Sequence, residues 1–284
     1  MRSPWRTWTC DRLGGAPHPF DAATALEVTG PNRFAGKTSP VYANMTGPFG
    51  GVTAATFLNA VLLHPDRAGD PVAETVNFCG AIAEGEFQIS CDLKRGGKYT
   101  QHWLLELTQD GETRGTASIV TGARGEVFSH HDADMPQAPA PENIDPLTMP
   151  GPLKWLDAYE FRFAEGRPEI SATPFEPLRD SRSLLWIADR PARALDHLAL
   201  AAFADTFLLR LLKVRGTWAP MGTVSLTTYF HATAAEIACH GSGPVLGQAV
   251  SKRMHAQFFD QHMELWAQDG TLLASGAQVA WYKA

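Results

Sequence analysis

One acidic side chain stands inside an almost entirely apolar stretch of the sequence. The stretch runs from Leu198 to Leu209, and only Asp205 and Thr206 interrupt its apolar residues. A carboxylate in such surroundings costs free energy unless it has a partner. It could act as a general base that takes a proton from water. It could equally be a structural acid paired with Arg210 or Arg215, because structural ion pairs also bury carboxylates.

The sequence lacks the motifs that indicate a covalent nucleophile or a metal site. No G-x-S-x-G element is present, so a serine nucleophile of the α/β-hydrolase type is not expected. The paired histidines at 130 and 131 lie in a proline-rich segment with no other ligand set nearby. The cysteines have neither a nucleophile motif nor metal-ligand spacing; they are Cys10, Cys79, Cys91 and Cys239. We therefore expect no covalent nucleophile, no metal ion and no cofactor.

The composition narrows the classes of partner. The chain has 284 residues, 44% of them hydrophobic and 19% charged, which is typical of a globular protein. Its net charge of −6 and its lack of a basic run argue against nucleic acid binding. No apolar run approaches the roughly 20 residues that span a bilayer, so no membrane partner is expected. The sequence start lacks the apolar core of a signal peptide, and the scattered cysteines suit a reducing compartment, so we expect a cytoplasmic protein.

Two apolar helices and the strands after them would have to position the acid. The spacing predicts one helix over 52–63 and a second over 198–209, each followed by alternating runs that indicate an antiparallel meander. Glycines precede the first helix in the run Gly47-Pro-Phe-Gly-Gly51, where they allow another group to come close to the helix N-terminus. After the second helix, the alternation from Thr223 to His231 predicts a strand.

The two halves of the chain repeat these elements in the same order. Thr56-Phe-Leu58 corresponds to Thr206-Phe-Leu208, and Gln109-Asp-Gly111 corresponds to Gln268-Asp-Gly270. Two copies are too few for an open solenoid, which favours a pair of packed domains. We expect an N-terminal domain over 20–125, a proline-rich linker over 126–153 and a C-terminal domain over 154–284.

Several motifs resemble those of one protein family, the bacterial acyl-CoA thioesterase II family. In the second half they are Ala201–Asp205, Thr223–His231 and Leu272–Gln278, and in the first half Phe49–Gly51, Leu93–Lys98 and Gln109–Gly111. The resemblance implies an α+β double hotdog, in which two tandem antiparallel sheets each wrap around a long central helix. It also implies an enzyme of lipid metabolism that hydrolyses an acyl-CoA thioester to free acid and CoA.

The resemblance also implies the residues that bind the hydrolytic water. In that family a helix Asp, a strand Thr and a last-strand Gln hold it, and by motif position these roles fall on Asp205, Thr223 and Gln278. Asp205 would activate the water without a metal. The plainer alternatives are that Thr223 is an ordinary strand residue and that Gln278 is an outward-facing polar position. The family's better-known members carry an Asp-His pair at the positions of Ser225 and Leu226.

Other groups are expected to bind the substrate. Backbone amides at Gly50 and Gly51, before the first helix, are candidates for the oxyanion site. Arg95 and Lys98 flank a tight Gly-Gly turn, where they could bind the phosphates of CoA or simply be a solvated hairpin tip.

The sequence leaves two alternative functions open, and it also predicts an oligomeric state. A hotdog hydratase or dehydratase would need an Asp-x-x-x-x-His element, but Arg210 stands at the histidine position. A non-catalytic acyl-CoA-binding protein would lack the water-binding trio or have a blocked pocket. Hotdog sheets leave an edge and a flat outer face that commonly pair, so a homodimer of double hotdogs is expected.

Overall fold

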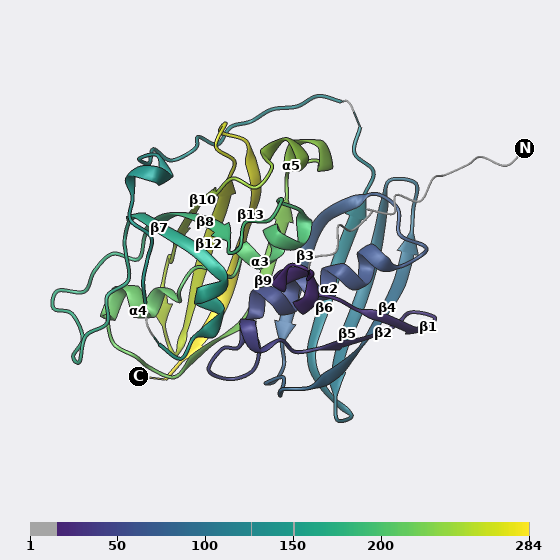
Figure 1. Cartoon of the computed structure of the whole chain (residues 1–284), viewed down its shortest axis with the longest axis horizontal. Coiled ribbons are helices and arrows are strands. Elements are labelled where there is room, and N and C mark those ends of the chain that lie inside the picture. The colour runs from purple at the N-terminus through teal and green to yellow at the C-terminus, as the bar shows by residue number, and fades with distance from the viewer. Residues whose placement is uncertain (1–15, 126, 150, 284) are drawn as a thin grey trace, which may run out of the picture.

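The chain forms two similar halves that lie side by side. The computed structural model describes residues 16–125, 127–149 and 151–283. The mixed composition of residues 1–19 predicts an irregular lead-in, and most of this stretch falls outside the described residues. Figure 1 shows the first half in purple and blue on the right and the second half in green and yellow on the left. None of the helices in the described ranges has the length and apolarity needed to cross a bilayer.

In the first half, the structure confirms the helix and the meander. The helix begins two residues earlier than predicted, at Gly50. The sequence from Asn32 to Tyr42 also predicts a strand, but the strand found there ends at Lys37, before Pro40 starts a short 3-10 turn. The elements are α1 (Pro19–Ala23), β1 (Glu27–Gly30), β2 (Arg33–Lys37), η1 (Pro40–Tyr42), α2 (Gly50–Leu63), β3 (Asp70–Phe78), β4 (Glu86–Gly96), β5 (Thr100–Gln109) and β6 (Glu112–Gly122).

The second half repeats this order and adds short helices. The strand expected over 223–231 is β9, and α5 is an addition that the sequence analysis missed, although a capping box of Thr233 and Glu236 starts it. The elements are η2 (Pro141–Asn143), η3 (Lys154–Ala158), β7 (Tyr159–Glu165), β8 (Ser183–Asp189), α3 (His197–Phe203), α4 (Arg210–Arg215), β9 (Met221–Phe230), α5 (Ala234–His240), β10 (Val245–Val250), β11 (Met254–His255), β12 (Phe258–Trp266) and β13 (Leu272–Tyr282).

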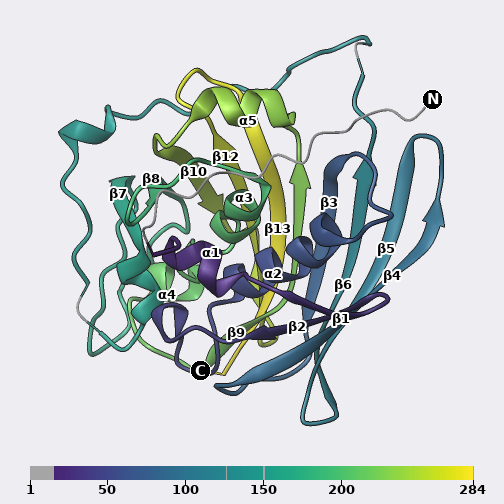
Figure 2. The same cartoon turned by 45° about the vertical axis from the view of Figure 1, so that its right-hand side comes forward.

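The strands of both halves form one continuous sheet. Within the described residues its order is β1-β2-β4-β5-β6-β3-β9-β13-β12-β10-β8-β7, with β11 paired to β12. This order is symmetric about the antiparallel pair β3–β9, where the hydroxyls of Thr75 and Thr227 lie 3.0 Å apart. In Figure 2 the strands of the first half curve around α2. The structure therefore confirms the α+β double hotdog.

The two central helices meet where the start of α2 lies against the end of α3. α2 is buried on nearly all its faces, as its apolar sequence predicts. A Cβ added at Gly51, near the start of α2, would lie 2.5 Å from the carbonyl oxygen of Ala202, near the end of α3. Only a glycine permits this close approach of the two backbones. The N-terminus of α2 and the C-terminus of α3 therefore lie side by side.

The second apolar helix is shorter than predicted. α3 ends at Phe203, and the chain turns before α4 begins at Arg210. At the turn the backbone N–H of Thr206 and its hydroxyl both donate to the carbonyl oxygen of Phe203, at 3.1 and 2.8 Å. The side chain thus competes for a carbonyl that a continuing helix would use. Asp205 consequently lies just beyond the end of α3.

The proline-rich segment predicted as a linker lies against the second half. Met135, Ala138 and Ile144 pack on an outer cluster that includes Trp186 and Trp266, on β8 and β12. The indole N–H of Trp186 donates to the carbonyl of Pro139, at 2.9 Å. The segment therefore covers part of the face of the sheet that points away from the helices.

Candidate active site

The carboxylate of Asp205 lies against the N-terminus of α2. A Cβ added at Gly50 would lie 2.6 Å from the Oδ2 atom of Asp205 and 3.2 Å from the ring of Phe78. The first N–H groups of a helix have no partner within it and carry a partial positive charge. The turn after α3 thus places an acid where α2 attracts negative charge.

The surroundings of Asp205 shift its acidity towards neutral pH. Burial raises the pKa of its carboxyl from 3.8 to about 7, and the backbone amide of Gly51 acts in the opposite direction. Asp205 forms no ion pair within the described ranges, so the alternative of a pairing with Arg210 or Arg215 does not hold. A carboxyl that titrates near pH 7 is suited to general base catalysis.

A bulge in β9 turns Thr223 towards the helices. In the β9–β13 ladder Gln278 pairs with Leu226 and Ala280 pairs with Thr223, so Val224 is an extra residue. Without the extra residue, alternation along β9 would put Thr223 on the outward face of the sheet, together with Ser225. The extra residue reverses this parity and puts Thr223 on the inner face.

The side chain of Gln278 is hydrogen-bonded to that of Thr223. The hydroxyl of Thr223 donates to the Oε1 atom of Gln278, at 2.6 Å. Gln278 is only 2% exposed, which excludes the outward-facing alternative. Its Nε2 atom is buried without a hydrogen-bond partner among the described atoms. Because a buried amide donor without a partner is costly, this atom fits a bound polar ligand or water.

Asp205 and Thr223 line the same cavity. Its volume is about 560 Å³ and most of its wall is apolar. Phe49, stacked on Trp155 at 4.2 Å, forms one side of the wall. Leu208, Leu209 and Leu212, from the turn before α4 and from α4 itself, form another. A polar end next to an apolar chamber suits a substrate with a reactive polar group and an apolar tail.

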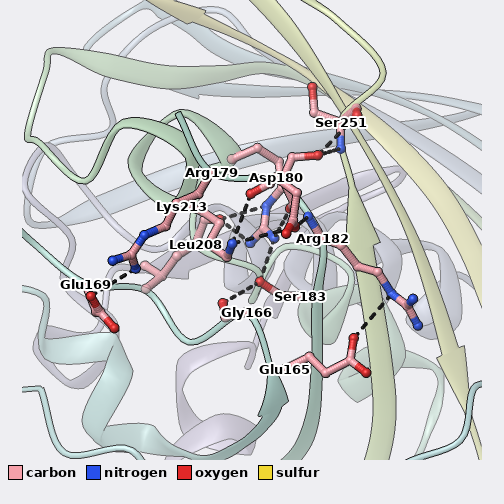
Figure 3. A network of polar contacts seen from close by, with 12 residues as sticks. Glu165, Gly166, Glu169, Arg179, Asp180, Arg182, Ser183, Leu208, Lys213 and Ser251 are labelled. Atoms are coloured by element: carbon pink, nitrogen blue, oxygen red, sulfur yellow. Dashed lines mark hydrogen bonds and ion pairs between the residues drawn. The ribbon is translucent and has the colours of Figure 1, made fainter. Parts of the chain in front are cut away.

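Buried cations hold the α4 side of the cavity in place. The guanidinium of Arg210 donates to the side chains of Gln261 and Ser183, both at 2.9 Å, and to the carbonyl of Leu208. Figure 3 shows the surrounding network, in which Lys213 donates to the carbonyl of Asp180 at 2.9 Å. Because burial has no acid to offset it, the pKa of Arg210 falls to about 9. From the sequence, Arg210 is a candidate partner of Asp205 only, and these bonds to Gln261 and Ser183 are not predicted.

Among the described residues this arrangement occurs once, although the fold is duplicated. The pairing Thr75–Thr227 relates Pro71 to Thr223, and a matching register shift follows Pro71 on β3. Ile119, which pairs with Glu74, corresponds to Gln278. The repeat of the central helices relates Ala55 to Asp205. These three counterparts lack the carboxylate, hydroxyl and amide.

The structure does not bring Arg95 to the cavity. Arg95 pairs with His102 next to the turn between β4 and β5. Thr100, at the start of β5, pairs with Gly122 at one end of β6. Gly115, at the other end of β6, pairs with Phe78, which lies beside Gly50 and Asp205. The β4–β5 turn is therefore at the opposite end of the strands from Asp205. Sequence spacing could not reveal this, because it depends on strand direction.

The sheet shows where Ser225 and Leu226 lie, the two positions at which this chain departs from the family motif. Leu226 is buried, pairs with Gln278 on one side and Val76 on the other, and carries no polar atom to bond to Gln278. Ser225 points to the other face. The amide of Gln278 is thus left to bond with Thr223 alone.

The sequence matches two domain families along most of its length. Residues 39–123 match the acyl-CoA thioesterase N-terminal domain, and residues 133–282 match the acyl-CoA thioesterase C-terminal domain. No curated protein sequence gives a match.

Solved structures share the whole fold. A conserved protein of unknown function with a hot dog fold from Alicyclobacillus acidocaldarius is 41% identical, with a TM-score of 0.89 over 95% of this chain and 99% of that one. The tesB protein of Mycobacterium avium subspecies paratuberculosis is 17% identical, with a TM-score of 0.75 over 93% and 98%. The acyl-CoA thioesterase II TesB2 of Mycobacterium marinum is 18% identical, with a TM-score of 0.71 over 93% and 98%.

Together, the matches to both domain families over most of the chain show that it belongs to the TesB-like acyl-CoA thioesterase family and is a thioester hydrolase.

Proposed function

We propose that the chain hydrolyses an acyl-CoA thioester with a water molecule activated by Asp205. The observation that supports this most is the shared cavity of Asp205 and Thr223, with Gln278 bonded to Thr223. The apolar wall would receive the acyl group. Gly50, Gly51 and the three polar side chains belong to this site in the proposal, and Arg95 does not.

The hydrogen bonds around Thr223 define how the water would be held. The proton of the Thr223 hydroxyl is used by Gln278, so its oxygen can only accept from the water. The unpartnered Nε2 of Gln278 can donate to the water oxygen. The carboxylate of Asp205 accepts the water's other proton. One lone pair of the water then remains free to attack the thioester carbonyl.

The reaction needs no covalent intermediate with the protein. As the water oxygen attacks the carbonyl carbon, Asp205 takes the proton that the water loses. The carbonyl oxygen becomes an oxyanion, and the N–H of Gly50, at the first position of α2, is the donor we assign to it. When the C–S bond breaks, Asp205 returns the proton to the departing thiolate. The products are the free acid and CoA.

The pH dependence of hydrolysis tests the role of Asp205. Because only the ionised carboxylate accepts a proton and its pKa is about 7, kcat/KM should rise about tenfold per pH unit below 7 and level off above it. Thiol release from a panel of acyl-CoAs, followed with a thiol reagent between pH 5 and 9, measures this. A flat profile on a substrate for which chemistry limits the rate would contradict the proposal, as would no thiol release from any acyl-CoA.

Removal of the other two polar groups should have smaller effects than removal of the base. Thr223→Val and Gln278→Leu should each lower kcat by about 10- to 100-fold, because each takes away one hydrogen bond to the water. The double variant should be hardly worse than the single ones, since Thr223 and Gln278 act as a pair. Single-turnover rates and thermal melts of all three variants check this. Fully multiplicative losses would show that the two side chains act separately.

Two broader expectations accompany this activity. We propose that the enzyme acts in lipid metabolism in the cytoplasm, where acyl-CoA is found. We also propose a homodimer, because the face of the sheet that points away from the helices exposes Tyr229, Val279 and Leu104.

A further inference from the structure

The described wall of the cavity contains one charged side chain, the carboxylate of Asp205. CoA carries several phosphate groups at the far end of its pantetheine arm. Phosphate groups are bound most strongly by arginine and lysine. The phosphates of the proposed substrate must therefore bind outside the cavity.

Three exposed cations lie next to residues of the cavity wall. Lys252, Arg253 and Lys283, here called the basic ridge, are exposed and form no ion pair within the described chain. Lys283 directly follows Tyr282, and its backbone N–H donates to the carbonyl of Pro220, at 2.8 Å. Pro220 is part of the cavity wall.

An apolar cluster joins the ridge to the cavity. Met254, the residue after Arg253, and Tyr282, the residue before Lys283, pack in the same cluster as Leu209 and Met221. Leu209 and Met221 also line the cavity. The ridge is therefore built on the outer side of the cavity wall.

The turn that carries two of the cations is firmly held. The carboxylate of Asp260 accepts the backbone N–H groups of Lys252 and Arg253, both at 2.9 Å, and the hydroxyl of Ser251, at 3.1 Å. These bonds lower the pKa of Asp260 against the effect of its burial. A fixed backbone reduces the entropy lost when its side chains bind a ligand.

The backbone of the ridge lies a short way along the strand from the water site, and the long side chain of Lys283 adds to that distance. Thr223 pairs with Ala280, and Lys283 is three residues further along the same strand direction, which corresponds to about 10 Å. Trp281, on the cavity wall, pairs with Phe258 on β12. Both rings are exposed, at 41% and 51%, and offer flat faces on which a purine base can stack.

We propose that the basic ridge binds the phosphate groups of CoA while the acyl group lies in the cavity. This inference depends on the proposed function for the identity of the substrate. The ridge takes the role that the sequence suggested for Arg95 and Lys98, which lie at the opposite end of the strands.

Equilibrium binding of CoA separates the two locations. The double variant Lys252→Gln/Arg253→Gln should bind CoA about tenfold more weakly by calorimetry, because charge-assisted hydrogen bonds are lost. The equal charge change in Arg95→Gln/Lys98→Gln should leave CoA binding within about twofold of the wild type, because exposed charges beyond the Debye length are screened. Loss of binding in the second variant and not in the first would overturn the proposal.

Turnover adds a second readout. The ridge variant should raise KM for an acyl-CoA about tenfold and leave KM unchanged for the same acyl group on pantetheine, which has no phosphate. An equal rise for both substrates would overturn the proposal, because it would mean a damaged cavity. The proposal would also be overturned if the ridge variant bound CoA normally but lost turnover of a thioester attached to acyl carrier protein, because the ridge would then bind the carrier protein. The CoA-binding measurement does not depend on hydrolysis. If an Asp205→Asn variant proved fully active, the proposed mechanism would be refuted, but the CoA-binding test of the ridge would still be valid.

Discussion

Asp205→Asn should lower kcat by about 10³-fold or more and leave the fold intact. A positioned general base contributes on the order of 10²- to 10⁴-fold, and here the chain offers no second base in the described cavity wall. Asparagine has almost the same shape and can still accept the amide of Gly51, but it cannot take a proton from water. Single-turnover hydrolysis of an acyl-CoA measures the loss.

The same substitution should make the protein more stable at alkaline pH. Because burial raises the pKa of Asp205 from 3.8 to about 7 in the folded state, the folded protein holds this proton more tightly than the unfolded chain. Its stability therefore falls as the pH rises from about 4 to 7, and the deficit persists above pH 7. The shift corresponds to a cost of up to about 4 kcal/mol, which an uncharged asparagine side chain would not incur. Thermal melts of both proteins at pH 5 and pH 8 should show a gain at both pH values that is clearly larger at pH 8.

The two readouts together distinguish a catalytic acid from a structural one. A catalytic Asp205 gives an inactive variant that is at least as stable as the wild type. A structural Asp205 gives an unstable variant whose folded fraction is still active. Full turnover in a folded Asp205→Asn protein would disprove the proposed mechanism.

The sequence could predict Asp205 but not what makes it distinctive. Glu74 is also a carboxylic acid among apolar residues; it is 1% exposed, neither of its oxygens has a described partner, and its pKa is raised well above the usual range by burial. Yet Glu74 does not line the cavity of Asp205. Burial alone therefore does not distinguish Asp205 from Glu74. Asp205 differs in its position at the N-terminus of α2, and that position depends on how two helices from distant parts of the chain pack.

The strand residues show the same limit. Alternation in 223–231 correctly predicts β9, but it places Thr223 on the wrong face, because one extra residue at Val224 reverses the parity. Only the motif resemblance identified Thr223 and Gln278. The placement of Arg95 depends on the order and direction of strands, which local sequence patterns do not encode. Similarly, the break after α3 depends on the hydroxyl of Thr206, which an apolar pattern does not reveal.

Gly50→Ala should lower kcat by about 100-fold with little change in thermal stability. The added Cβ would lie 2.6 Å from the Oδ2 atom of Asp205, which is the end of a side chain that can rotate away. A displacement of about 1 Å at a catalytic group can cost about 10²-fold in rate. The helix itself should tolerate the change, because alanine has a higher helix propensity than glycine. Hydrolysis rates and thermal melts measure the two effects separately.

Gly51→Ala is the matched comparison, because the same methyl group one residue later meets a different neighbour. Its Cβ would lie 2.5 Å from the carbonyl oxygen of Ala202, which belongs to the backbone of α3 and cannot rotate away. The two helices would have to separate, which should destabilise the protein by about 1–3 kcal/mol and lower Tm by several degrees. Gly50→Ala should therefore lose activity at nearly unchanged stability, whereas Gly51→Ala should lose stability as well as activity. If Gly50→Ala kept its full rate, Asp205 could not be working from the position it occupies against α2.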